Sequence, residues 1–318
     1  MITYLIRRLL SLLPVLFSIT FLAFVLGNLA PGDPATQVYI ARTGEPPPNN
    51  EVVEEIREEL GLNDPLPLRF VYWLADILQG DMGQSYRTGQ PVFMELRQHA
   101  GITFRLAVLG AALAAAISIP LGCLAAIYQN KPIDLGIRTV GLLGASMPSF
   151  WLAYLLILVF GVRLQLLPVA GMGSWQHMIL PVFSISLFGV ATISRLLRAS
   201  LLEALNSDYI RMARAKGLRE RRVILLHALT NSLIPVITIL GNLFGGLVAG
   251  AVIIETIFAL PGLGRLIIDA ISFRDYPIIQ GFVIFTGTVF TLVNLVVDLS
   301  YVAIDPRIRL GGRGGVGG

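Results

Sequence analysis

Long apolar runs without a charged residue are the feature that most limits how this 318-residue chain can fold. A membrane-spanning helix needs about 20 apolar residues, because each residue adds about 1.5 Å and the hydrocarbon core is about 30 Å thick. Only 14% of the residues are charged, against about 25% in a typical soluble domain. Six runs approach or exceed the required length, and they cover residues 9–30, 106–128, 139–162, 178–194, 232–254 and 277–297. The sequence therefore predicts an all-α integral membrane protein with six transmembrane helices.

The distribution of Lys and Arg predicts which side of the membrane each end of the chain occupies. Short cytoplasmic connections are enriched in these two residues. With a cytoplasmic N-terminus, most of the 24 Lys and Arg residues fall on the cytoplasmic side, and the densest cluster lies between residues 207 and 222. An even number of spans then places both termini in the cytoplasm. The net charge of +4 follows from this topology, so it gives no reason to expect nucleic-acid binding.

The first apolar run could belong to a cleaved signal peptide or to a retained span. Arg7 and Arg8 precede it, and Leu29 with Ala30 could pass for a weak cleavage site. Its uncharged stretch is longer than the roughly 7 to 15 residues of a signal sequence, which favours a retained span. The single cysteine, Cys123, excludes an internal disulfide, and no metal-ligand cluster is visible. No cofactor or metal is therefore expected.

The long polar segment after the first span has the composition of a small folded subdomain. Asn49 or Asn50 can cap a helix that carries Glu51 in its first turn and ends at Gly61. A second stretch places four apolar side chains on one helix face, namely Phe70, Trp73, Leu74 and Ile77. This face either covers the ends of the spans or forms a docking platform for an external partner.

The expected organisation has four parts. Residues 1–30 are the cytoplasmic N-terminus and first span, and residues 31–105 form the external subdomain. Residues 106–304 hold the five further spans, with a cytoplasmic connector at 199–231. The Gly-rich residues 305–318 form a flexible cytoplasmic tail.

The basic stretch 207–222 has two interpretations. As a topology signal it needs only positive charge, which would also contact anionic membrane lipid. However, Ser207 or Asp208 can cap a short helix here, and Gly217 can end it in a left-handed turn. A rod of about ten residues would be about 15 Å long and could fit into a groove of a partner. The residues alone leave both interpretations open.

The chain carries no recognisable motif for driving transport or catalysis by itself. Neither of its lysines, Lys131 and Lys216, ends a phosphate-binding G-x-x-x-x-G-K-[ST] loop, so ATP energy must come from another subunit. The three histidines form no H-E-x-x-H pattern, and no G-x-S-x-G elbow is present. The middles of the spans lack ionisable residues, which argues against an ion-driven transporter. A non-catalytic role is expected, with an intramembrane enzyme as the alternative from a different class.

Polar and small residues within the spans could line a translocation path or join neighbouring helices. The candidates for a path or gate are Ser146, Ser149, Asn242, Gly245, Gly246 and Asn294. Four charged residues near the external ends of the last spans could pair with one another or face a docked partner, and they are Glu255, Arg265, Arg274 and Asp275.

Six ordered motifs resemble one protein family. The basic stretch reads "DYIRMARAKGL" and is followed by "HALTNSLIP", and the other motifs include "SMPSFWLA", "ETIFALPGLGRL", "RDYPIIQ" and "DPRIR". In order and spacing they resemble permease subunits of binding-protein-dependent ABC importers, specifically the dipeptide, oligopeptide and nickel branch. The resemblance covers nearly the whole chain. It implies a type I importer permease fold with six spans in a bacterial inner membrane.

The resemblance also implies partners and a coupling site. The partners would be a second homologous permease, two cytoplasmic ATPase subunits and an external substrate-binding protein. The residues that would couple to an ATPase are Asp208, Tyr209, Arg211, Ala213, Arg214, Ala215, Lys216, Gly217 and Leu218. The broader superfamily often has Glu-Ala-Ala before the loop glycine, whereas this chain has Arg211 in the place of that Glu. The expected substrates are di- or oligopeptides, with nickel, a nickel chelate or glutathione as alternatives.

Overall fold

The structure is a computed structural model that describes residues 2–29 and 32–304. The expected tail, residues 305–318, lies outside the described residues. Within the described part, strand pairing is limited to one isolated bridge between Gln84 and Pro91, and all longer elements are helical. The all-α prediction is therefore confirmed.

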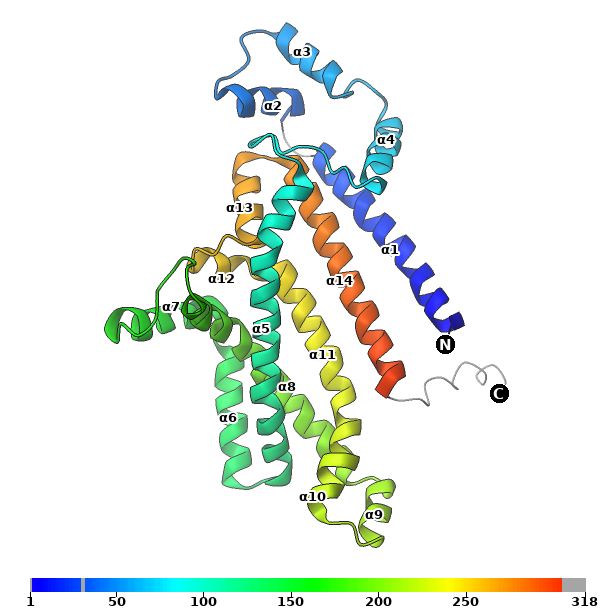
Figure 1. The fold of residues 1–318 in the computed structure, drawn as a ribbon, viewed down its shortest axis with the longest axis vertical. Helices are drawn as coiled ribbons and strands as arrows, with labels where there is room; N and C mark the ends of the chain where they lie inside the picture. The colour runs from blue at the N-terminus through cyan, green and yellow to red at the C-terminus, as the bar shows by residue number, and fades with distance from the viewer. Residues whose placement is uncertain (1, 30–31, 305–318) are drawn as a thin grey trace. The chain divides into compact units, whose positions relative to one another are not determined.

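The helices are labelled in Figure 1 in chain order. The first four helices are α1 (Ile2–Leu29), α2 (Pro34–Thr43), α3 (Asn50–Glu59) and α4 (Leu66–Leu78). Then follow α5 (Val92–Ile127), α6 (Pro132–Ser146), α7 (Ser149–Leu156), the π-helix η1 (Ile157–Arg163) and the short η2 (Trp175–Met178). The remaining helices are α8 (Ile179–Leu205), α9 (Asp208–Ala215), α10 (Glu220–Arg222), η3 (Val223–Ala228), α11 (Leu229–Gly250), α12 (Val252–Ile257), α13 (Leu263–Phe273) and α14 (Tyr276–Ile304).

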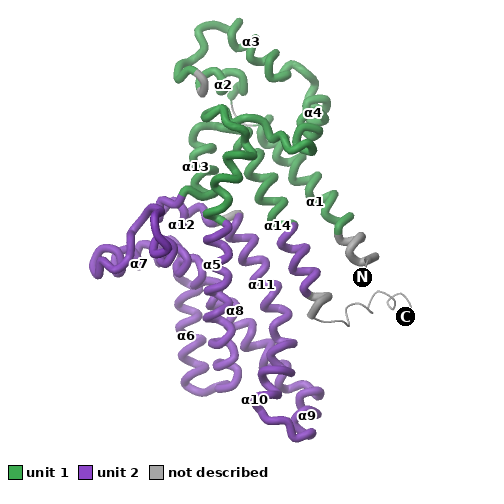
Figure 2. Tube along the Cα trace, viewed as in Figure 1, with its two compact units in different colours: residues 1–103, 261–291 green, residues 104–260, 292–318 purple. Residues whose placement is uncertain are grey.

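The chain divides into two compact units, which Figure 2 colours separately. Unit 1 comprises residues 1–103 and 261–291. Unit 2 comprises residues 104–260 and 292–318. The long helices α5 and α14 each contribute one part to each unit.

In unit 1, helix α4 lies against helix α1 through aromatic contacts. The ring of Phe70 meets the rings of Phe21 and Phe24 edge-on, with centroids 5.4 and 5.2 Å apart. Trp73 contacts Phe24, with centroids 5.4 Å apart. Edge-to-face pairs of this kind add stability beyond the apolar area that they bury. The predicted apolar face of α4 is therefore real, and Phe70 and Trp73 use it to cover the first span.

Helices α2 and α3 form a small core of their own in unit 1. Ala35, Val38 and Ile56 are buried against each other. An ion pair between Asp33 and Arg57, with Oδ1 and Nη2 2.9 Å apart, joins the start of α2 to α3. This core gives the segment from α2 to α3 a local structure of its own.

The predicted caps of α3 are present. The Asn49 side chain accepts a hydrogen bond from the Val52 amide at 3.1 Å, which satisfies one of the free donors at the helix start. Gly61 follows the end of the helix with φ of +61°, a conformation that glycine adopts without strain.

The core of unit 2 lies between α5, α8 and α11. Its buried side chains are Ala114, Val190, Ile193, Leu197 and Val236. A Cβ atom on Gly122 would lie 2.9 Å from the Ser194 carbonyl oxygen, so a glycine at this position lets α5 approach α8 closely. Gly241 serves the same purpose in α11, because a Cβ there would lie 2.1 Å from a methyl group of Val297.

The number of spans agrees with the prediction only if one bent pair of helices is counted as a span. Five single helices are long and apolar enough to cross a membrane, and the sixth span would be α6 together with α7 and η1. These two parts meet at an angle of 99°. Met147 has an extended backbone, which the following proline favours, and Pro148 is the N-cap residue of α7. The predicted span over 139–162 is therefore bent within the run, between α6 and α7.

Two predicted span ends also differ from the structure. The fourth helix, α8, runs on to Leu205 instead of ending at Ser194, so part of the expected connector 199–231 is helical. The fifth, α11, ends at Gly250 and not at Ile254, and the next residues form the separate helix α12.

Candidate functional site

The basic connector in unit 2 contains the predicted short helix, α9. Ser207 is its N-cap residue and has an extended backbone. Its hydroxyl group does not cap the helix but donates to the Ala204 carbonyl at 2.5 Å. The first turn holds an exposed ion pair between Asp208 and Arg211, with Oδ1 and Nη1 3.3 Å apart. The predicted start is therefore correct, although the side-chain bond expected at the cap is replaced by one to the preceding turn.

The end of α9 has the hydrogen bonds of a Schellman motif. The Gly217 amide donates to the Arg214 carbonyl at 2.9 Å, and the Leu218 amide donates to the Ala213 carbonyl at 3.4 Å. Gly217 has φ of +77°, which a side chain would disfavour. The predicted left-handed stop at Gly217 is confirmed.

One face of α9 is anchored in the core of unit 2. Ile210 is fully buried, and Ala213 is 9% exposed. Both belong to a cluster with Ala126 of α5, Leu201 of α8 and Val223 of η3. Leu218 packs against the same cluster. Of the residues expected to couple to an ATPase, Ala213 and Leu218 therefore pack into the chain's own core.

The opposite face of α9 is open to solvent. Met212 is 61% exposed and Tyr209 is 43% exposed. Arg211, Ala215, Lys216 and Gly217 are also exposed. Two large apolar side chains on the surface of a basic helix are the kind of patch that marks an interaction site.

Two polar contacts tie this exposed face to neighbouring segments. Arg214 makes a two-point ion pair with Glu220 of α10, at 3.1 and 2.6 Å. The Asn231 side chain donates to the Tyr209 hydroxyl at 3.2 Å. Arg214 therefore holds the connector together in addition to carrying charge.

A two-point ion pair that the sequence did not suggest lies between α6 and α8 in unit 2. Arg198 Nε and Nη2 donate to Asp134 Oδ1 and Oδ2, both at 2.7 Å. Asp134 is fully buried and also accepts from the Asn130 amide at 2.9 Å. One feature of the sequence was consistent with this pair. Asp134 and Arg198 stand near the ends of spans that were expected on the same side of the membrane.

The candidate path residues do not gather at one place that the structure defines. Ser146 and Ser149 are exposed and flank the break between α6 and α7. Asn242 and Gly246 are exposed one turn apart on α11, whereas Gly245 is buried. Asn294 is half-buried in α14.

The candidate residues of the external mouth have different environments. Glu255 in α12 is fully buried, and Arg265 and Arg274 are exposed. Asp275 is buried in unit 1, where its carboxylate accepts from the Ser85 hydroxyl and from the Tyr86 amide at 3.1 Å. Asp275 therefore fixes the loop before α5.

Tyr86 in this loop has a raised pKa. Burial of its ring and the nearby negative charge of Asp275 raise the pKa of Tyr86 to about 12. Both effects disfavour the phenolate.

Among the described residues no group of three or more His, Cys, Asp or Glu side chains could hold a metal ion.

Comparison with known families decides the class of protein. Residues 118–310 match the family described as the inner membrane component of binding-protein-dependent transport systems. Residues 1–107 match the N-terminal family of the same membrane components. This chain belongs to that permease family. The predicted resemblance is therefore confirmed over nearly the whole length of the permease.

Curated relatives match the permease from end to end. It is 40% identical to a probable peptide ABC transporter permease of Sinorhizobium fredii, over 96% of this chain and 99% of that protein. It is also 40% identical to the glutathione transport system permease protein GsiC of Escherichia coli K12, over 97% of this chain and 99% of that protein. A putative peptide transport permease of Brucella abortus is 39% identical over 97% of this chain.

Solved structures support the fold of the permease. The MetNI methionine ABC transporter, in inward-facing conformations, contains a chain that matches with a TM-score of 0.55 and 16% identity. The match covers 66% of this chain and 96% of that chain. The protein is thus a multi-pass membrane permease of the ABC importer class, a class that works with ATPase and binding-protein partners.

Proposed function

We propose that this permease forms the transmembrane path of an ATP-driven importer for di- or oligopeptides, together with a second homologous permease. Two cytoplasmic ATPase subunits would supply the energy, and an external binding protein would deliver the substrate. The similarity over the full length of relatives named for peptide transport carries the substrate class. The permease itself would be non-catalytic.

The orientation follows from charge. The basic connector around α9 would lie in the cytoplasm, because short cytoplasmic segments are rich in Lys and Arg. Both termini would then be cytoplasmic in a bacterial inner membrane. The segment from α2 to α4 would be external, and Glu255, Arg265, Arg274 and Asp275 would lie near the external mouth.

Helix α9 would be the coupling element that enters a groove on an ATPase subunit. Its buried face, built on Ile210, fixes it to the spans, and its exposed face offers Tyr209 and Met212 among basic side chains. A helix anchored in this way transmits displacement as a rigid body, whereas a flexible loop would absorb it. Within the coupling segment 208–218, Arg211, Ala215, Lys216 and Gly217 would face the ATPase.

The path would use some of the polar and small residues of the spans. Ser146 and Ser149 at the break, Asn242 and Gly246 on α11, and Asn294 on α14 are the candidates, and the exposed side of α11 could also meet the second permease. Small residues suit either role, because they permit close helix approach.

Glutathione is the second candidate substrate, because GsiC of Escherichia coli is as similar to this chain as the peptide permease is. Nickel or a nickel chelate is a further alternative within the same branch. Uptake of a labelled peptide in the presence of unlabelled peptide, glutathione or nickel distinguishes the three candidate substrates.

The test is ATP-driven uptake by the assembled transporter. The permease is expressed with the genes beside it, purified with any ATPase subunit that stays bound, and reconstituted into proteoliposomes. We expect peptide uptake that needs both ATP and the binding protein. Ala215→Trp should abolish ATPase association while the variant still inserts into the membrane, and Ala215→Ser is the matched control. An assembly that forms equally well with Ala215→Trp contradicts the coupling role, and uptake of glutathione alone replaces the peptide assignment.

A further inference from the structure

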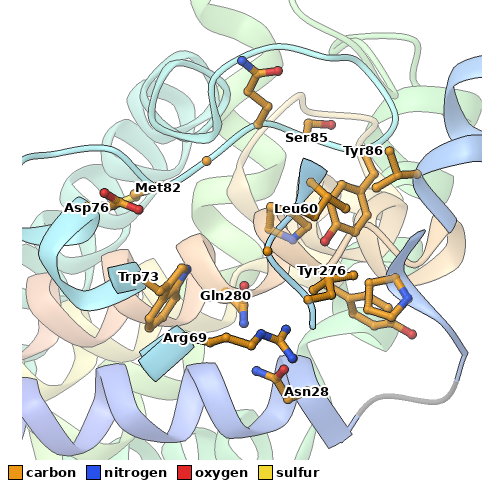
Figure 3. Close-up of a pocket in the computed structure, with 18 of the residues that line it drawn as sticks. Asn28, Leu60, Arg69, Trp73, Asp76, Met82, Ser85, Tyr86, Tyr276 and Gln280 are labelled. Atoms are coloured by element: carbon orange, nitrogen blue, oxygen red, sulfur yellow. The ribbon is translucent and has the colours of Figure 1, made fainter. Parts of the chain in front are cut away.

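Unit 1 contains a cavity of about 770 Å³ that none of the roles above uses. Its walls come from the end of α1, from α4, from residues 82–89 and from the start of α14 (Figure 3). The cavity is within the size range of sites that bind small molecules. Both polar and apolar side chains line it, so it suits an amphipathic ligand.

Three side chains that line the cavity are spaced along one face of α4. Arg69, Trp73 and Asp76 stand at positions i, i+4 and i+7, so they follow one another over two helical turns. The rise from the first to the last is about 10 Å. A positive charge, an aromatic ring and a negative charge are therefore arranged in a row.

Neither charge at the ends of this row has a direct partner within the described part of the chain. Arg69 is half-buried and feels the charge of Asp64, but it makes no ion pair and no side-chain hydrogen bond with the described residues. The Asp76 carboxylate likewise has none. The Arg69 guanidinium can therefore bind an acceptor that a ligand brings, without first breaking an ion pair or a side-chain hydrogen bond with the described residues.

The wall around Arg69 consists of hydrogen-bonding side chains. Figure 3 shows its guanidinium group between the amides of Asn28 and Gln280. The Gln280 amide donates to the Ala23 carbonyl of α1 at 3.3 Å, and a Cβ on Gly27 would clash with Gln280 at 2.1 Å. A side chain at position 27 would therefore move the Gln280 amide from its place in the cavity wall.

The overall charge of the lining disfavours a purely anionic ligand. Glu59 and Asp64 line the cavity in addition to Asp76, against the two basic residues Arg69 and Arg87. Arg87 is engaged with the ring of Phe273, 4.1 Å from its centroid. A ligand that carries an ammonium group as well as an anionic group fits this balance better.

We propose that this cavity binds a short zwitterionic peptide, with its carboxylate on Arg69, its ammonium group near Asp76 and a side chain against Trp73. An extended chain spans about 3.3 to 3.6 Å per residue, so about three residues match the rise of about 10 Å along α4 between positions 69 and 76. A phosphoethanolamine headgroup separates its charges by only a few bonds and is too short. The assignment of the ligand as a peptide rests on the proposed function. The assignment of the ligand as a zwitterion rests only on the charges that line the cavity.

Calorimetric titration of the full-length permease in phosphatidylcholine nanodiscs tests the proposal, with trialanine as the probe. We expect Arg69→Gln to weaken trialanine binding about tenfold, as the loss of a hydrogen bond to a charged group predicts. Asp76→Asn should weaken it similarly. Arg97→Gln removes the same charge from an exposed position outside the cavity and should have no effect.

Blocked peptides show which end of the ligand meets which residue. Trialanine amide should bind wild type weakly and should lose nothing more with Arg69→Gln, while N-acetyl-trialanine should be insensitive to Asp76→Asn. The comparison of the three peptides on the wild-type permease does not depend on whether the variants fold. Equal effects of Arg69→Gln on all three peptides would overturn the proposal.

Two further results would also overturn it. One is the absence of trialanine binding to wild type, and the other is phosphatidylethanolamine that copurifies with wild type but not with Arg69→Gln. The binding assay needs no ATPase. Peptide uptake without binding here would therefore reject this cavity alone, and binding without ATP-driven uptake would reject only the proposed function.

Discussion

Arg198 of α8 donates two hydrogen bonds of 2.7 Å each to the buried carboxylate of Asp134 in α6. Because Asp134 is fully buried, loss of its partner would leave an uncompensated charge inside the protein, at a cost of about 3–5 kcal/mol. We expect Arg198→Ala to lower the melting temperature in detergent by several degrees.

Arg198→Lys keeps the charge but not the planar fork, and it should give an intermediate loss. Arg195→Lys is the matched control, since Arg195 lies three residues away and is exposed. Equal melting temperatures for the variants at positions 195 and 198 would show that the pair contributes no net stability.

Burial of the Ile210 side chain should be what holds α9 rigidly against the core of unit 2. Removal of a fully buried isoleucine side chain costs about 2–5 kcal/mol, which a helix of only eight residues cannot compensate. Ile210→Ala should therefore increase amide hydrogen exchange across residues 207–218. Met212→Ala, on the exposed face, should leave exchange unchanged. If the two variants exchange alike, the anchoring of α9 lies elsewhere.

Gly217 should tolerate only residues that accept a positive φ. Ordinary side chains pay about 1–2 kcal/mol in this conformation, and β-branched ones pay more. Gly217→Val should fray the end of α9 and reduce copurification of an ATPase, while Gly217→Asn should be close to wild type. Wild-type behaviour of the valine variant would mean that the Schellman turn is unnecessary for coupling.

Tyr86 should make the protein sensitive to alkali. Its pKa is about 12 in the folded protein, against about 10 in an unfolded chain. The folded state therefore keeps the proton longer than the unfolded state does. The contribution of neutral Tyr86 is fully present below about pH 10 and is lost as pH rises toward about 12.

Comparison with Tyr86→Phe isolates this contribution. The difference in melting temperature between wild type and the variant should be constant below about pH 10 and should shift in favour of the variant above it. Phenolate absorbance that the variant lacks should appear only near pH 12. A difference spectrum that titrates near the normal pKa of tyrosine would contradict the buried environment.

Local chemistry allowed much of the fold to be predicted. Uncharged apolar runs located the spans, and the caps at Asn49 and Gly217 depend on residues within a few positions of each other. The bend in the third span lies at Pro148, which disfavours helix at Met147. Proline alone does not predict this bend, because Pro14, Pro120 and Pro235 lie within continuous helices. Hydropathy does not predict it either, because the run 139–162 is continuously apolar.

Features that depend on tertiary contact were not predictable in the same way. Asp134 and Arg198 are 64 positions apart, and only the packing of α6 on α8 brings them together. The two sides of α9 were not separated either. Ala213 and Ala215 were both expected among the coupling residues, yet residues two apart on a helix point to nearly opposite sides. Helical periodicity would have assigned Ala213 to the same side as Ile210.

The Schellman turn at Gly217 also limits how the connector can change over time. The buried Ile210 and the glycine stop together set the length and rotation of α9. One inserted residue would turn everything after it by about 100° and move the exposed surface away from its neighbour. A substitution on the outward face of α9 therefore changes one side chain and leaves the others in place, whereas the count of residues from Ser207 to Gly217 should stay the same in descendants of this chain.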